Sequence, residues 1–295
     1  MTDAIPVIRG FHRTVTQRVG ALNTQYLGRD RPLAESRLLF EIGTDGAPVR
    51  ELRVRLGLDS GFVSRMLRAL EHEGLVRTIR QADNDGRARF SRLTKAGKSE
   101  LRKLNELSDR LAQSILTPLS AEQSRRLIAA MTEVERLLRA SAVELSIENP
   151  SSQDAARCLE QYFQELTVRF RKGFDPRLSI SAAADELTPP KGYLVIARLY
   201  GQPLGCGALK VTGRRMGEVK RMWVTRHARG LGLGRRILGE LERMARIRNL
   251  KILRLETNES LKEAQALYRT SGYTEVDAFN EEPYAHHWFE KHLNE

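Results

Sequence analysis

A glycine-rich turn between a strand-like segment and a helix-like segment constrains this chain more than any other feature. Residues 218–234 read EVKRMWVTRHARGLGLG, and the helix-forming run RRILGELERMARIR follows. Glycines tolerate positive φ angles and let a ligand approach the backbone. The first turn of a helix adds unpaired N–H groups and the positive end of its dipole. The segment therefore predicts a site for an anion such as a pyrophosphate.

The spacing of the glycines distinguishes three kinds of phosphate-binding turn. The dinucleotide fingerprint G-x-G-x-x-G fails because the glycine it needs after Gly230 and Gly232 is Arg235. The P-loop fails because the terminal Gly-Lys-Ser/Thr is missing. The remaining pattern, R-x-x-G-x-G at Arg229, Gly232 and Gly234, directly follows a strand-like run. It resembles the acetyl-coenzyme A loop of the GNAT N-acetyltransferase superfamily.

A second motif supports this resemblance. The strand-like run ILRLETN at 252–258 precedes a predicted helix over 261–270, which closes with YRTSGY at 268–273. A tyrosine four residues before a glycine-aromatic pair, after a strand and a helix, is also similar to the GNAT pattern. The resemblance covers the second half of the chain and implies a domain over 141–295. It also implies an α+β GNAT fold with a mixed sheet flanked by helices.

The resemblance implies acetyl-CoA as the co-substrate, an amine as the acceptor, and particular site residues. An alkyl amine must lose a proton before it attacks, because its pKa is about 10.4. Tyr268 is expected beside the sulfur as the acid that protonates the departing thiolate, and Glu218 as a base acting through water. The backbone of Trp223 and Val224 is expected to pair with the pantetheine arm, and Asn258 to contact the cofactor. The expected cofactor loop consists of Arg229, Gly230, Leu231, Gly232, Leu233, Gly234 and Arg235.

Each of these residues also has a structural interpretation, and the residues alone leave both open. Tyr268 is then a packed aromatic, Glu218 a solvated carboxylate and Asn258 a turn residue at a strand end. Arg221 and Arg254 are candidates for binding a substrate carboxylate, with a solvated charge as the alternative.

A local excess of positive charge marks the first half of the chain. The net charge is +12, and residues 50–103 carry 14 Lys/Arg against 7 Asp/Glu, the footprint of a polyanion partner. The sequence predicts a helix over 49–56, a break at Gly57, and a second helix over 60–74 that Asp59 or Ser60 caps. Together they form a helix-turn-helix pattern. The face of the second helix opposite its apolar stripe shows Ser60, Gly61, Ser64, Arg65 and Arg68.

A basic hairpin follows, with strands over 75–80 and 87–93 around the turn at 83–86. Together with LDSGFVSRMLRALEHEGLV, Asp85-Gly86-Arg87 and LTKAG, it resembles the MarR family of winged-helix regulators. This resemblance covers residues 5–140 and implies a mostly-α winged helix-turn-helix domain over 1–140. It further implies double-stranded DNA as a partner, a homodimer, and one recognition helix and wing per half-site.

Specific side chains are expected to contact DNA. Arg65 and Arg68 suit guanine edges or phosphates in a major groove, and Arg87 and Arg89 on the wing suit phosphates or a minor groove. With Ser60 and Ser64 they form the predicted DNA-binding set; a solvated basic face is the alternative.

Periodicity predicts the remaining elements. One helix is expected over 5–27, and a second one capped by Asp30. Two long amphipathic helices over 95–116 and 120–140 suit the dimer. The rest of the chain is expected to contain a strand over 143–147, a helix over 154–172 and a loop over 173–191 that borders the substrate site. A hairpin over 192–200 and 204–211 and a final strand over 288–293 are also expected.

Length and composition narrow the class further. A chain of 295 residues predicts two domains. The absence of a run near 18 apolar residues and of a signal pattern predicts a cytoplasmic protein. Cys158 and Cys206 lack the spacing of paired ligands, so we expect neither a disulfide framework nor a metal site, and we expect Cys158 to lie in the core.

These observations predict a bifunctional protein: a MarR-like DNA-binding transcriptional regulator fused to an acetyl-CoA-dependent N-acetyltransferase. The acceptor is expected to be an amine of a small molecule, a protein lysine or a protein N-terminus. A first alternative is a regulator whose GNAT-like domain senses an acyl-CoA or an amine without turnover. A second is an enzyme whose winged domain only dimerises.

Overall fold

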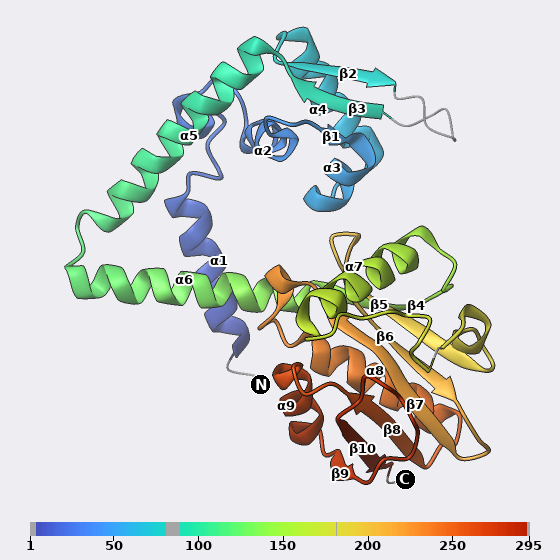
Figure 1. Cartoon of the computed structure of the whole chain (residues 1–295). Coiled ribbons are helices and arrows are strands. Elements are labelled where there is room, and N and C mark those ends of the chain that lie inside the picture. Colours follow the sequence, from blue (N-terminus) through green and yellow to red (C-terminus); the bar gives the residue numbers. More distant parts are fainter. Residues whose placement is uncertain (1–3, 81–88, 181, 294–295) are drawn as a thin grey trace. The chain divides into compact units, whose positions relative to one another are not determined.

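The computed structural model describes residues 4–80, 89–180 and 182–293 (Figure 1). The chain divides into two compact units, Met1–Met131 and Thr132–Glu295. The division falls within helix α6 (Ala121–Ser141). The domain limit at 140/141 remains a prediction from the sequence.

The N-terminal unit combines helices with a small antiparallel sheet. In chain order its elements are α1 (Ala4–Arg18), η1 (Tyr26–Gly28), α2 (Leu33–Ile42), β1 (Ala47–Pro48), α3 (Val49–Leu56), α4 (Ser60–His72), β2 (Val76–Arg80), β3 (Arg89–Leu93) and α5 (Lys95–Leu116). The strands lie in the order β1-β3-β2. This arrangement confirms the predicted mostly-α winged helix-turn-helix fold.

Local sequence explains how the helix-turn-helix forms. Gly57 ends α3 in a left-handed conformation, φ 64°, which costs glycine little. Asp59 is the N-cap of α4, and its side chain accepts a hydrogen bond from the Phe62 N–H at 2.9 Å. The apolar stripe of α4, including Val63 and Leu67, is fully buried against the other helices of the unit. The opposite face is left to solvent.

Two predictions at the start of the chain were wrong. The single helix expected over 5–27 ends at Arg18, because Gly20 takes a positive φ of 69° that a helix cannot continue through. Asp30 does not cap α2. That helix begins at Leu33 after Pro32, and no side chain caps it.

The C-terminal unit is built on a seven-stranded sheet in the order β4-β5-β6-β7-β8-β10-β9. Its elements after α6 are β4 (Val143–Glu148), α7 (Gln153–Arg169), η2 (Ala184–Leu187), β5 (Gly192–Leu199), β6 (Gln202–Val211), β7 (Met216–Val224), η3 (Arg226–Ala228), α8 (Leu233–Ile247), β8 (Ile252–Thr257), α9 (Lys262–Thr270), β9 (Thr274–Val276) and β10 (His287–His292). Within the described residues, β7 and β8 are the one pair of sheet neighbours that run parallel. The sheet is therefore mixed, as predicted; β9 and the short η2 turn were not predicted.

Helices cover the sheet because its central strands are apolar on both sides. In β5, Leu194 and Ile196 join one buried cluster with Cys158 of α7. Their neighbours Val195 and Ala197 join a second cluster with the buried face of α8. Successive strand residues point to opposite faces, so α7 and α8 belong to opposite sides of the sheet (Figure 1). Burial of Cys158 in this core agrees with the prediction.

The parallel pair β7–β8 separates along its length. The two strands are paired only where Met216–Glu218 meets Ile252–Arg254. Beyond Glu218, β7 continues to Val224 with β6 as its neighbour. The backbone of Trp223 and Val224 therefore has an edge that β8 does not pair.

No helix within the described ranges is long and apolar enough to cross a membrane.

Candidate active site

The glycine-rich turn lies at the end of β7 and opens into a cavity. Gly230 and Gly232 have φ angles of 80° and 73°, and a Cβ at either position would meet no atom within 4 Å. Gly232 is the N-cap of α8 and makes no side-chain capping bond to the first turn of that helix. Main-chain N–H groups at this helix start are thus accessible to a ligand.

The cavity has a volume of about 500 Å³ and a composition suited to a nucleotide with an apolar arm. Three arginines and one glutamate line it together with apolar side chains of β7, α8 and α9: Arg169, Arg229, Arg235, Glu263, Met222, Trp223, Val224, Leu233, Leu261, Ala264, Leu267 and Tyr268. Guanidinium groups and helix N-termini bind phosphates. The lining therefore fits a pyrophosphate at the loop and an uncharged chain between β7 and α9.

A second, smaller cavity of about 80 Å³ adjoins the first. Leu261, Ala264 and Tyr268 of the α9 region line both cavities. Aromatic and acidic side chains make up about half of the remaining lining, which consists of Tyr162, Phe170, Phe174, Tyr284, Glu256 and Glu282 together with Leu166, Ser179, Thr257, Asn258 and Ala285. Aromatic faces and carboxylates are groups that bind ammonium ions.

Tyr268 lies in the shared wall and is buried, with 5% of its surface exposed. Its ring packs against Tyr273 and Phe289 at centroid distances of 6.0 and 5.9 Å. Burial raises the pKa of the Tyr268 phenol, with smaller contributions from Tyr162 and the Glu256 carboxylate. The hydroxyl therefore stays protonated at neutral pH, as a proton donor requires.

Asn258 follows β8 and lines the small cavity, not the large one, among the described lining residues. Its Nδ2 donates to the Tyr284 carbonyl at 2.7 Å, and its Oδ1 accepts from the Ser260 N–H at 2.9 Å. These bonds shape the loop after β8. The predicted cofactor contact of Asn258 remains a prediction.

Two carboxylates share one buried lysine. Lys220 Nζ lies 2.5 Å from Glu256 Oε1 and 3.1 Å from Glu218 Oε2. Burial alone lowers the pKa of Lys220, but the two carboxylates leave it above its ordinary value. Lys220 is therefore charged and is paired with two carboxyl groups.

Only one of these carboxylates faces the small cavity. Glu256 lines it, whereas Glu218 is not among the described residues lining either cavity. The second oxygen of Glu256, Oε2, is buried and has no hydrogen-bond partner within the described part of the chain. Glu256 was not predicted from the sequence. The available signal was the segment LRLET at 253–257, in which charged residues alternate with two buried leucines.

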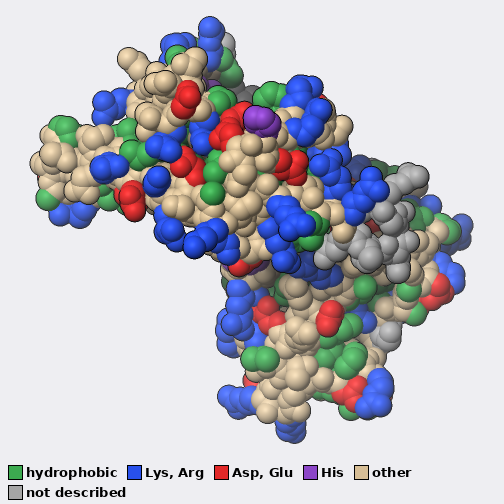
Figure 2. Space-filling view, turned by 90° about the horizontal axis from the view of Figure 1, so that it is seen from above, with side chains coloured by type: hydrophobic (Ala, Val, Ile, Leu, Met, Phe, Trp, Pro, Cys, Tyr) green, Lys and Arg blue, Asp and Glu red, His purple; other side chains and the backbone are tan. Residues whose placement is uncertain are grey.

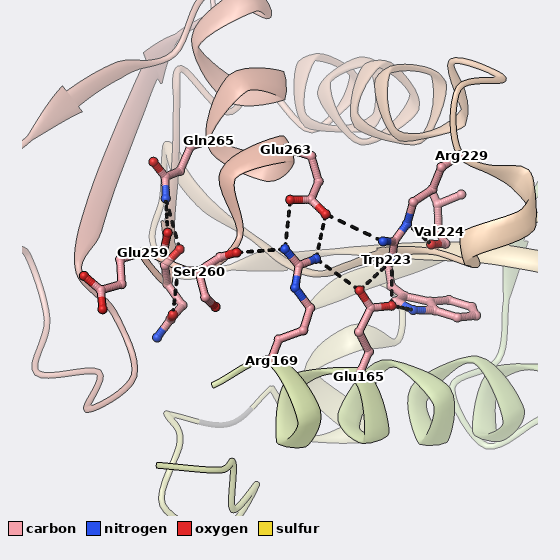
Figure 3. A network of polar contacts seen from close by, with 10 residues as sticks. Glu165, Arg169, Trp223, Val224, Arg229, Glu259, Ser260, Glu263 and Gln265 are labelled. Atoms are coloured by element: carbon pink, nitrogen blue, oxygen red, sulfur yellow. Dashed lines mark hydrogen bonds and ion pairs between the residues drawn. The ribbon is translucent and has the colours of Figure 1, made fainter. Parts of the chain in front are cut away.

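The predicted loop residues lie together at the large cavity. Arg229 Nη2 binds both oxygens of Glu165 at 2.6 Å, and its Nε donates to the Val224 carbonyl at 3.1 Å (Figure 3). Arg235 Nη2 donates to Thr270 Oγ1 at 3.1 Å. Leu233 is buried in the core, and Leu231 packs against it. The Gly230 carbonyl accepts a hydrogen bond from Arg136 of α6.

The predicted DNA-binding side chains lie on α4 and the hairpin. Four of them are exposed: Ser60, Arg65, Arg68 and Arg89. Ser64 is half-buried, and Arg87 lies outside the described residues. The Arg65 guanidinium lies 5.6 Å from the centre of the Phe62 ring. On the face shown in Figure 2, basic side chains predominate over acidic ones.

Two regions of the chain match known families. Residues 129–273 match the acetyltransferase (GNAT) family, and residues 29–88 match the MarR family. The chain therefore combines a MarR-family region with a domain of the GNAT acetyltransferase family. This confirms the fusion predicted from the sequence.

Particular relatives resemble part of the chain. An "IAA acetyltransferase" of Azospirillum brasilense is 40% identical over 94 residues, which are 32% of this chain and 61% of that protein. The chain thus spans less than two thirds of that relative. An uncharacterized N-acetyltransferase of Schizosaccharomyces pombe is 28% identical over 130 residues, 41% of this chain and 80% of that protein. The crystal structure of an acetyltransferase from Streptococcus agalactiae matches 52% of this chain and 99% of its own, with 18% identity and a TM-score of 0.44.

Proposed function

We propose that the C-terminal domain binds acetyl-CoA and transfers its acetyl group to an amine. The observation that carries this proposal is the position of Tyr268 in the wall shared by the two cavities. One cavity offers phosphate-binding groups, and the other offers the aromatic rings and carboxylates that bind an ammonium ion. The names of the relatives, acetyltransferase and N-acetyltransferase, support the same reaction class.

The residues of this chain have distinct tasks in the proposal. The glycine loop and Arg235 hold the pyrophosphate of acetyl-CoA, which supplies the acetyl group as a thioester. Glu256 accepts a proton from the ammonium group, because its free oxygen is buried beside the small cavity. The neutral amine attacks the thioester carbonyl and the C–S bond breaks; Tyr268 donates its phenolic proton to the thiolate that leaves, and the second proton lost by the new amide nitrogen restores the phenol. Glu218, the base predicted from the sequence, is the alternative proton acceptor.

A coenzyme release assay over a panel of small amines and lysine peptides tests the reaction. Tyr268→Phe is expected to lower turnover about a hundredfold, since general acid catalysis contributes at least that much, while coenzyme affinity stays nearly constant. Tyr273→Phe is the matched control. It removes the hydroxyl of a neighbouring buried tyrosine that is not among the described residues lining either cavity.

The outcome also separates the enzyme from a sensor. Equal turnover in wild type and Tyr268→Phe would remove Tyr268 from the mechanism. Coenzyme binding by calorimetry without release for any amine would favour a non-catalytic sensor of acyl-CoA or amine.

We also propose that the N-terminal unit binds double-stranded DNA as a homodimer. Exposed Arg65, Arg68 and Arg89 on the recognition helix and hairpin support DNA binding. Helix α1 supports association, because none of its residues is buried and it exposes Val7 and Phe11 by 70% and 43%. A long helix with an apolar face open to solvent is typical of a surface that a second copy covers.

Fluorescence anisotropy with operator fragments selected from random DNA tests this second proposal. Arg65→Ala is expected to weaken binding about tenfold or more and to flatten its salt dependence. Arg37→Ala removes the same charge from α2, where Arg37 pairs with Glu41, and serves as the control. Equal losses in the two variants would indicate a general charge effect and count against α4 as the recognition helix. Sedimentation equilibrium measures the dimer independently.

A further inference from the structure

The guanidinium of Arg229 is already engaged within the protein. Its Nη2 binds both carboxylate oxygens of Glu165 at 2.6 Å, and its Nε donates to the carbonyl of Val224 at 3.1 Å. The Val224 carbonyl lies at the end of β7, where the chain turns into the glycine loop. Arg229 therefore connects the start of that loop back to its strand.

Glu165 is the acceptor on which these contacts converge. Besides Arg229, it accepts from the indole Nε1 of Trp223 at 3.1 Å and from Arg169 Nη1 at 3.2 Å (Figure 3). Its side chain is 11% exposed. Burial alone raises the pKa of Glu165, but the hydrogen bonds from Arg229 and Arg169 leave it below its ordinary value. A charged carboxylate thus holds Trp223 of β7 and the first arginine of the loop, and that arginine in turn holds the Val224 carbonyl.

The network continues from α7 to α9. Arg169 binds Glu263 through its Nη1 and Nη2 atoms, at 2.6 and 2.9 Å, and its Nη2 also donates to the Ser260 carbonyl at 2.8 Å. Arg229, Arg169 and Glu263 all line the large cavity. The cavity is therefore bounded on one side by a continuous chain of ion pairs that starts at Glu165.

From this geometry we infer that Glu165 is a positioning residue for the cofactor loop. It holds Arg229 against the Val224 carbonyl, so that the loop presents its main-chain N–H groups to the pyrophosphate in a fixed arrangement. Arg229 then acts as a brace of the loop, and the phosphate contacts fall to the backbone and Arg235. The inference rests on the proposed function, since it concerns the affinity of the same cavity for the coenzyme.

A double-mutant cycle measured by calorimetry with CoA tests this inference. Glu165→Gln is nearly isosteric and keeps an oxygen that accepts from Trp223, but it loses the charged, two-point contact with Arg229. We expect it to raise the Kd for CoA about tenfold, the range of a charge-assisted hydrogen bond. Arg229→Gln is expected to raise the Kd at least as much. The double variant should be no worse than Arg229→Gln alone, because both changes remove the same contact.

Glu160→Gln is the matched control, since Glu160 is exposed on the same helix and bonds only Gln164 among the described residues. Thermal unfolding of each variant without CoA shows whether the fold is intact. Unchanged or tighter binding by Glu165→Gln would overturn the inference, and so would effects of Glu165→Gln and Arg229→Gln that simply add. A wild-type protein that binds no CoA would instead refute the proposed function.

Discussion

Exchanging either carboxylate beside Lys220 for an amide separates two assignments of the catalytic base. Glu256→Gln and Glu218→Gln each replace one carboxyl partner of Lys220 by a neutral amide. Each leaves Lys220 with one carboxylate, at 3.1 Å in the first variant and at 2.5 Å in the second. The electrostatic change is therefore nearly matched, and the variants differ mainly in whether the altered group lines the small cavity.

The expected magnitudes follow from this arrangement. A general base contributes about 10²- to 10⁴-fold, so Glu256→Gln should lower kcat/KM by about a hundredfold or more. Glu218→Gln should lower it less than about tenfold. Both variants should remain folded, losing about 1–3 kcal/mol of unfolding free energy, because neither leaves the buried ammonium unpaired.

Steady-state kinetics across pH with a reactive amine provide the measurement. At any one pH, kcat/KM should fall strongly in Glu256→Gln and little in Glu218→Gln, since only loss of the base removes its contribution to the reaction. Urea denaturation of both variants controls for stability. A large kinetic loss confined to Glu218→Gln would refute the assignment and restore Glu218 as the base.

Two further predictions concern stability. Gly207→Ala in β6 should lower the free energy of unfolding by about 1–3 kcal/mol, because the new Cβ would lie 2.5 Å from Ile237. Gly239→Ala in α8 should raise it by about 0.5–1 kcal/mol, because a Cβ there meets no atom within 4 Å. Denaturant midpoints measure both changes, and equal shifts would contradict the packing argument. The hydrogen bond from Arg169 lowers the pKa of Glu263 to about 2 from an ordinary 4.5, so the pair stabilises above about pH 4.5 and loses its contribution as pH falls towards 2. The free energy of unfolding of Glu263→Gln should therefore depend less on pH over that range than that of the wild type. The difference should be less than about 1 kcal/mol, since the Glu263 side chain is half exposed. Parallel curves of unfolding free energy against pH for the two proteins would exclude the effect.

Local chemistry explains which features the sequence could predict. The glycine loop depends on φ angles and a helix start that a few adjacent residues determine, and Gly230 and Gly232 take the positive φ expected of them. The helix-turn-helix was predictable for the same reason, because Gly57 and Asp59 end one helix and cap the next.

Long-range pairing explains what the sequence did not predict. Glu218 and Glu256 both lie on strands, and which of them meets a cavity depends on where β7 and β8 separate. Glu165 and Arg169 are four residues apart on a helix, a spacing typical of an ordinary surface ion pair. Only the packing of α7 against the end of β7 makes Glu165 a partner of the loop.

Helix α7 places residues beside both of the neighbouring cavities. Tyr162 and Leu166, with Phe170 at the C-cap, border the small cavity, while Glu165 and Arg169 belong to the ion pairs beside the large one. A shift or rotation of this helix that admits a bulkier acceptor must also move the carboxylate that braces the loop. We therefore expect a trade-off: variants selected for new acceptors through this helix should lose coenzyme affinity, whereas changes at Phe174 or Tyr284 can broaden acceptor choice without that penalty.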